Sequence, residues 1–123
     1  MLSKLRAQND NICVLRVDPK VLDLPGVIIA DRNAASGWAR FSPVAEGLKR
    51  IDRDRVFGRY WTHPQDEYEE MSHKSEKCAE VLVPDCIRPS FLLGAYVVNE
   101  VALQKFQQLN IGLPVRIRSD IFF

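Results

Sequence analysis

The sequence predicts an α+β fold with short helices, because apolar runs of strand length alternate with helix-like segments along its 123 residues. Hydrophobic residues make up 46% of the chain, which is enough for a packed core, and the length is typical of one domain. No internal repeat or low-complexity tract interrupts this pattern. We therefore expect residues 1–123 to form a single domain.

The first third of the chain contains strand candidates. Residues 12–17 are a short apolar, β-branched run that ends at an Asp-Pro pair, as a mostly buried strand would. The runs at residues 21–24 and 27–30 flank a Pro-Gly pair and predict strand, turn, strand. Small and turn-forming residues follow at 31–37 and favour a tight connection.

The middle of the chain is less regular. Residues 43–60 are helix-like but interrupted, and Asp52 is placed to cap a second short helix. Residues 62–77 are mostly polar and predict an exposed loop with one helical turn. Loops of this length in compact domains are more often functional than short connections are.

The last third has the clearest pattern. Residues 78–83 form an apolar run that contains Glu80 and predicts a strand, and residues 95–98 predict another. Asn99 is placed to cap a helix that runs to about Leu109, and residues 115–117 predict a last short strand.

Charge and composition restrict the class of protein. The 17 Lys and Arg residues and 16 Asp and Glu residues leave a net charge of +1, so a surface for nucleic acid must be local. No apolar stretch reaches the roughly 18 residues of a membrane span, and the first ten residues lack a signal-peptide core. The irregular cysteines Cys13, Cys78 and Cys86 predict reduced, buried thiols. We expect a cytoplasmic protein without a membrane partner.

Glu80 is the leading candidate for chemistry. A carboxylate inside an apolar strand must point off an edge, find a partner or face a cleft. Strand alternation places it on the same face as Cys78 and Leu82. The residues alone leave two alternatives open, a functional carboxylate or a salt bridge to a cation such as Lys77.

Other constellations predict no site. His63, His73, Cys78 and Cys86 match no compact zinc-ligand spacing, so we predict no metal. Asp85 lacks the second acidic residue that a nuclease centre needs, and the six glycines are too scattered for a phosphate-binding loop.

Four stretches resemble the DarT family in order and spacing, namely residues 12–17, 31–37, 60–61 and 77–84. The resemblance covers residues 11–109 and implies the carboxy-terminal, catalytic-glutamate half of an ADP-ribosyltransferase-like fold with a mixed sheet. It implies NAD as substrate, no permanently bound cofactor, and a thymidine base in single-stranded DNA as acceptor. Glu80 matches the family's catalytic glutamate, whose expected role is to bind the ribose next to nicotinamide and stabilise its positive charge.

The resemblance further implies that residues 33–77 help to hold the DNA. Aromatic side chains in such a region stack on bases, and basic ones contact phosphates. Simpler roles remain open, because a tryptophan can pack in the core, an asparagine can bond its own turn, and basic residues can be merely solvated. The predicted DNA-binding residues are Asn33, Arg40, Trp61, Lys74 and Lys77.

The family's amino-terminal NAD-binding segment, with a histidine and an arginine, has no counterpart here, so no NAD-binding residue is assigned. We expect the chain to be incomplete alone, as a truncated gene product, as half of a split toxin, or as a degenerate remnant. The expected partners are the missing half and a macrodomain antitoxin. The alternatives are an inactive fragment that binds single-stranded DNA or a protein, and an unrelated small α+β domain.

Overall fold

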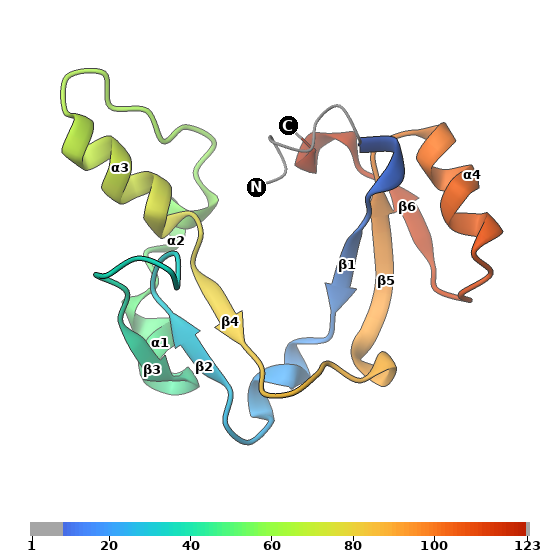
Figure 1. The fold of residues 1–123 in the computed structure, drawn as a ribbon, viewed down its shortest axis with the longest axis horizontal. Helices are drawn as coiled ribbons and strands as arrows, with labels where there is room; N and C mark the ends of the chain where they lie inside the picture. The colour runs from blue at the N-terminus through green and yellow to red at the C-terminus, as the bar shows by residue number, and fades with distance from the viewer. Residues whose placement is uncertain (1–8, 123) are drawn as a thin grey trace. The chain divides into compact units, whose positions relative to one another are not determined.

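The computed structural model describes residues 9–122, which belong to two compact units (Figure 1). Unit 1 combines the two ends of the chain, up to Pro19 and from Ile87 onward, and unit 2 is Lys20–Cys86. Each unit pairs a small sheet with short helices. This arrangement confirms the predicted α+β class.

Unit 1 is built on a mixed sheet of order β1-β5-β6, in which β1 and β5 are antiparallel and β5 and β6 are parallel. One face is covered by α4, and the core consists of Ala95, Val97, Ala102 and Phe106. Asn99 caps α4 as predicted, because its Oδ1 accepts a hydrogen bond from the Ala102 amide at 2.9 Å. The elements are β1 (Val14–Val17), η3 (Pro89–Phe91), β5 (Leu92–Val97), α4 (Glu100–Gln108), β6 (Val115–Ile117) and η4 (Ser119–Ile121).

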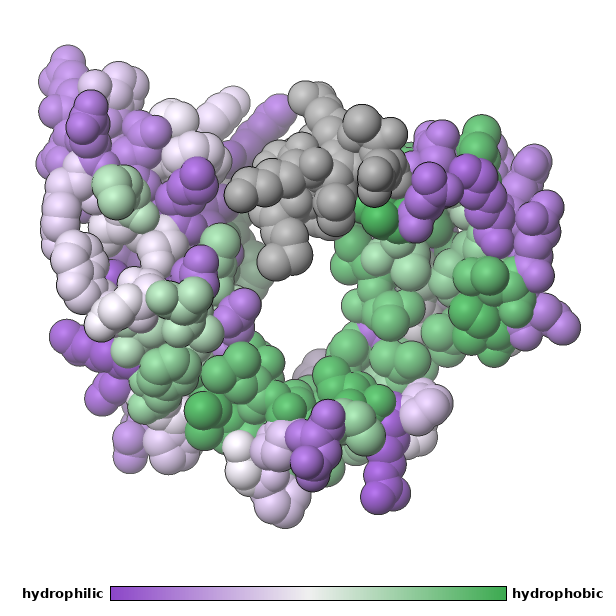
Figure 2. All heavy atoms as spheres, in the orientation of Figure 1, coloured by the Kyte–Doolittle hydropathy of each residue, from purple (hydrophilic) through white to green (hydrophobic). Residues whose placement is uncertain are grey.

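Unit 2 contains an antiparallel sheet of order β3-β2-β4, with β2 at its centre. Its elements are η2 (Pro19–Asp23), β2 (Ile28–Ala30), β3 (Phe41–Pro43), α1 (Val44–Arg50), α2 (Arg53–Phe57), α3 (Glu67–Glu76) and β4 (Glu80–Leu82). Ile29 of β2 is buried and lies against Gly47 of α1, so α1 covers the sheet face to which Ile29 points. Hydrophobic residues gather near β2 and β4, whereas α3 is covered mainly by hydrophilic and neutral residues (Figure 2).

Two predictions of secondary structure are wrong. Residues 21–24 belong mostly to the 3-10 helix η2 instead of a strand, because Pro19 fixes a helical φ at its start. Residues 62–77 contain the ten-residue helix α3 instead of a loop. Asp66 caps this helix through the Glu69 amide at 3.0 Å, and acidic residues occupy its first turn, where the helix dipole favours them.

The three thiols are free, but the prediction that they are buried is wrong, since Cys13, Cys78 and Cys86 are all exposed. Cys13 and Cys78 precede β1 and β4, and Cys86 lies in the connection after β4, so none of the three belongs to a strand whose alternation would bury it. Within residues 9–122, no helix has both the length and the apolar character needed to span a bilayer.

Candidate functional site

Glu80 is the first residue of β4 and pairs with Ala30 of the central strand β2. Side chains of directly paired residues point to the same face of a sheet, and neighbouring residues point to opposite faces. Glu80 and Ala30 therefore face away from α1, on the side opposite Ile29. Glu80 is exposed there, and its Oε2 accepts a hydrogen bond from the Ala34 amide at 3.3 Å.

The loop that supplies this amide is fixed by bonds within unit 2. Asn33 Oδ1 accepts a hydrogen bond from the Ala35 amide at 3.0 Å, and the Asn33 amide donates to the Ser75 carbonyl at 2.9 Å. Asn33 thus bonds its own turn, which was the simpler of its two expected roles. The same turn presents the Ala34 amide to Glu80, so the structure brings these two predicted site regions together.

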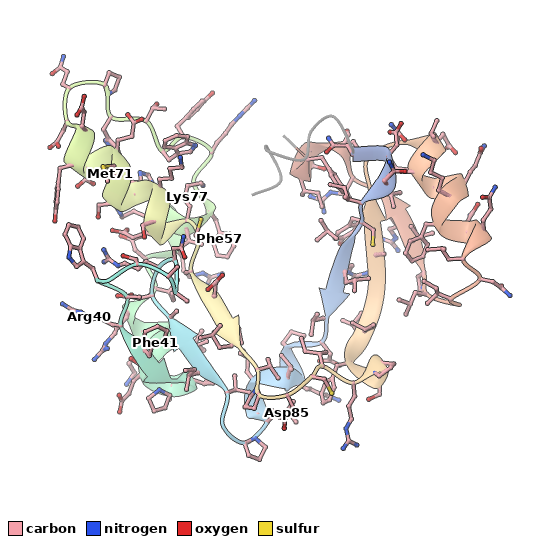
Figure 3. All side chains as sticks on the ribbon, viewed as in Figure 1. Arg40, Phe41, Phe57, Met71, Lys77 and Asp85 are labelled. Carbon is pink, nitrogen blue, oxygen red and sulfur yellow. The ribbon has the colours of Figure 1, made fainter. Side chains whose placement is uncertain are left out.

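A salt bridge between Glu80 and Lys77 is not formed. Lys77 Nζ instead donates to the backbone carbonyl of Val56 at 3.1 Å and to that of Gly58, beyond the end of α2. Figure 3 shows Lys77 and Phe57 close together at this end of α3. In the described part of the chain, Glu80 has no ion-pair partner, so its charge is not neutralised.

Trp61 lies beside Lys74, a residue in the last turn of α3. Lys74 Nζ is 5.3 Å from the centre of the Trp61 ring, a cation–π distance. Both residues line an open cavity of about 460 Å³. Trp61 is half-buried, so part of its ring packs against the protein and part stays accessible to a base. Arg40 is exposed at the start of β3 and lines a different cavity of the same unit.

Helix α3 is held to α2 by polar contacts. Arg55 donates from Nη1 to Glu69 at 2.6 Å and from Nε to Glu76, and the hydrogen bond to Glu76 is the main cause that raises the pKa of Arg55. Buried His73 donates from Nε2 to the Arg55 carbonyl at 2.9 Å, which leaves its Nδ1 to accept from His63 Nε2 at 3.0 Å. Within residues 9–122, no cluster of three potential ligands could hold a metal ion.

Five aromatic side chains are exposed in the described residues, and all five belong to unit 2. Two of them, Trp38 and Tyr68, form a ring pair with centroids 5.6 Å apart and exposed fractions of 62% and 64%. Tyr68 was not predicted as a stacking residue, because the sequence did not predict the helix that presents it. The exposed aromatic residues are Trp38, Phe41, Phe57, Tyr60 and Tyr68.

Comparisons with known proteins agree with this geometry. The structure resembles that of Thermosipho africanus DarTG in complex with ADP-ribose, with a TM-score of 0.81 and 23% identity over 100% of this chain and 33% of that chain. It also resembles Thermus sp. 2.9 DarT in complex with NAD+, with a TM-score of 0.71 and 20% identity over 90% of this chain and 57% of that one. The same Thermus protein in complex with ADP-ribosylated ssDNA gives a TM-score of 0.71 and 20% identity, over 90% and 54% of the two chains.

These likenesses define the fold as part of an ADP-ribosyltransferase fold. A family model described as "ssDNA thymidine ADP-ribosyltransferase, DarT" matches residues 1–123, and the chain therefore belongs to the DarT family. A search of curated proteins found no match. The chain spans about a third of the Thermosipho chain and just over half of the Thermus chains.

Proposed function

We propose that this chain is the glutamate-bearing part of an enzyme that transfers ADP-ribose from NAD to thymidine bases in single-stranded DNA. The supporting observation is the state of Glu80, an exposed carboxylate with one oxygen bonded to the Ala34 amide and with no ion-pair partner among residues 9–122. Membership of the DarT family supports the reaction class. The structural neighbours that hold NAD+ and ADP-ribosylated ssDNA support the two substrates.

In the proposed reaction, the Glu80 carboxylate stabilises positive charge on the ribose as its bond to nicotinamide breaks. The Ala34 amide orients one carboxylate oxygen, and the other accepts a hydrogen bond from a ribose hydroxyl. A fixed negative charge next to an oxocarbenium-like centre stabilises the transition state more than the ground state, which is the condition for catalysis. Glycosidases use carboxylates in the same way.

The proposed DNA contacts come from unit 2. Trp61 offers a ring face for a base, Arg40 and Lys74 offer charge for phosphates, and Asn33 holds the loop beside Glu80. Lys77, predicted from the sequence to bind DNA, supports these contacts indirectly, because its bonds to the carbonyls of Val56 and Gly58 hold the segment that leads to β4. The concentration of exposed aromatic side chains in this unit supports single-strand binding, since each stacked base contributes about 1–3 kcal/mol.

We further propose that activity requires a segment that this chain does not carry. The chain spans only part of the length of the solved DarT proteins, and misplacing a substrate by about 1 Å can lower a rate about 100-fold. The expected histidine and arginine would come from that segment, and residues 1–123 would form one domain together with it. We also propose that the complete protein is a cytoplasmic toxin and that its partner is a macrodomain antitoxin.

The test supplies an amino-terminal DarT segment to this chain, with NAD and a thymidine-containing oligonucleotide, and measures ADP-ribose on the DNA by mass. Glu80→Gln keeps an oxygen to accept the Ala34 hydrogen bond but removes the charge, so the rate should fall about 10²- to 10³-fold. Glu46→Gln, which removes an exposed charge on α1, is the matched control and should react like the wild type. Equal rates in the wild type and Glu80→Gln would refute the assignment.

The second candidate function is single-strand binding without catalysis, favoured by the five exposed aromatic residues. It predicts that the chain binds the oligonucleotide yet yields no ADP-ribosylated DNA when completed.

A further inference from the structure

Unit 2 contains a cavity of about 360 Å³ whose lining includes Arg40, one of the proposed phosphate contacts, and whose other residues have no role in the proposed transfer. It lies on the sheet face that α1 covers, since Arg50 at the end of α1 donates from Nη1 to Ser42 Oγ at 2.8 Å, and Ser42 pairs with Ile29. Glu80 points to the other face. The lining residues are Asp31, Arg32, Arg40, Arg50, Asp52, Arg55, Val56 and Glu76, and Figure 3 shows Arg40 at the outer edge beside β3.

Part of the charge in this cavity is already paired. Arg55 is bonded to Glu76 and Glu69, and its guanidinium is therefore neutralised. The Asp52 carboxylate is used as the cap of α2, where it accepts hydrogen bonds from the Asp54 and Arg55 amides. These contacts fix the positions of the lining residues. Because the Asp52 and Glu76 carboxylates are already bonded, the cavity has little capacity to bind a further cation.

The remaining arginines have unused donors. In the described part of the chain, the Arg40 guanidinium has no hydrogen bond or ion pair, and Arg50 uses only one nitrogen, toward Ser42. Arg32 Nε forms an ion pair with Asp31 Oδ1 at 3.5 Å, yet this buried nitrogen has no hydrogen-bond partner among residues 9–122. Three guanidinium groups with free donors therefore meet in one cavity.

These donors define the chemistry of the ligand. Guanidinium groups form forked hydrogen bonds with phosphate oxygens, and a buried unpaired donor favours an anion that can satisfy it. Val56 is the sole apolar residue of the lining and no aromatic ring belongs to it, so the hydrogen-bond donors dominate its chemistry. The preferred ligand is a phosphate and not a nucleoside.

We propose that the Arg32, Arg40 and Arg50 cavity binds a phosphate of the DNA strand that carries the acceptor base. The proposal rests on the proposed function for the identity of the strand. Arg40 follows the exposed Trp38 by two residues, so one strand can reach both a stacking ring and the cavity. Because Glu80 points to the opposite face of the sheet, the bound phosphate belongs to a flanking nucleotide and not to the reacting one.

The test measures binding of a ten-nucleotide oligothymidylate to the full chain as a function of salt, by fluorescence anisotropy. Neutralising one phosphate of a single strand contributes about 0.7 to the slope of log affinity against log salt concentration. Arg40→Gln should reduce the steepness by about 0.7 and weaken binding roughly fivefold at 0.1 M salt. Arg53→Gln, an exposed arginine of α2 outside the cavity, is the control and should keep the wild-type slope.

Three further arms make the outcome decisive. The Arg40 guanidinium has no bond to lose among residues 9–122, so an unchanged unfolding midpoint is expected for Arg40→Gln, and this result excludes misfolding as the cause of weaker binding. Thymidine, which has no phosphate, should bind the wild type and Arg40→Gln equally. An unchanged salt slope in Arg40→Gln overturns the proposal, as does inorganic phosphate that binds at the cavity without competing with the oligonucleotide. These binding results are independent of transfer by Glu80, so the two proposals can fail separately.

Discussion

The contact between α1 and the central strand β2 predicts how a substitution at Gly47 changes the stability of the sheet that carries Glu80. Gly47 of α1 lies against Ile29 of β2, and a Cβ added at Gly47 would lie 2.8 Å from Ile29 Cγ1 and nearer still to Ile29 Cβ. Ordinary contacts of this kind are 3.4–4 Å. Gly47→Ala therefore forces α1 away from the sheet or distorts Ile29.

Two effects of opposite sign decide the magnitude. Alanine is favoured over glycine in a helix interior by about 1 kcal/mol, which would stabilise the variant. The clash opposes this gain, because Ile29 is only 2% exposed and its branched side chain is stiff, and overpacking of a core costs about 1–3 kcal/mol. Because the added Cβ would lie well inside contact distance of three Ile29 atoms, we expect the clash to cost about 2–3 kcal/mol and the net loss in the free energy of unfolding to be about 1–2 kcal/mol.

The assay is denaturant unfolding of the full chain, followed by circular dichroism, with Gly37→Ala as the matched control. No atom lies within 4 Å of a Cβ added at Gly37, and its φ is compatible with alanine, so this variant should be unchanged or stabilised by up to about 1 kcal/mol. The expected difference between the two variants is about 1–3 kcal/mol. If Gly47→Ala is as stable as Gly37→Ala, the close packing of α1 on β2 is refuted.

Three further predictions concern the cap of α3, the lysines Lys74 and Lys77, and the ion pair between Arg118 and Asp120. Asp66→Ala should lower the free energy of unfolding by about 1 kcal/mol through loss of the α3 cap, whereas Asp66→Asn retains a capping oxygen and should lose less. Lys77→Met should lower the free energy of unfolding by about 1–3 kcal/mol, since it removes the hydrogen bonds to α2, and should leave the salt slope of DNA binding unchanged. Lys74→Met should reduce that salt slope by about 0.7. The hydrogen bond from Arg118 lowers the pKa of the Asp120 carboxyl below 3.8. The contribution of this carboxylate to stability is therefore present above its unfolded pKa and is lost as the pH falls through its folded pKa. NMR titration should show the lowered pKa of Asp120 and its return toward 3.8 in Arg118→Gln.

The sequence predicted the elements whose signals are local. Asn99 and Asp52 each precede a short helix and cap it as expected, since an Asx side chain reaches amides two or three residues ahead. Helix α3 was missed because its surface is almost wholly polar and shows little helical periodicity of apolar residues. A signal was present in Asp66 with the acidic first turn and in the basic residues of the last turn, which match the helix dipole.

The arginine cavity could not be predicted in this way. Arg32 and Arg40 meet because the chain reverses between β2 and β3, with the Asp31 amide donating to the Arg40 carbonyl at 3.2 Å. Arg50 reaches the same place because α1 packs back on the sheet and bonds Ser42. No fixed spacing links these positions, so the cluster exists only in the tertiary structure.

The geometry of Glu80 separates what this chain can supply from what a complete enzyme needs. A single hydrogen bond of 3.3 Å from the Ala34 amide orients the carboxylate, yet it does not hold a dinucleotide in reactive geometry. The exposed aromatic rings and the arginine cavity both belong to unit 2, so the proposed DNA contacts do not depend on a further segment. DNA binding should therefore be measurable with the chain alone, whereas transfer should appear only when the rest of the fold is supplied.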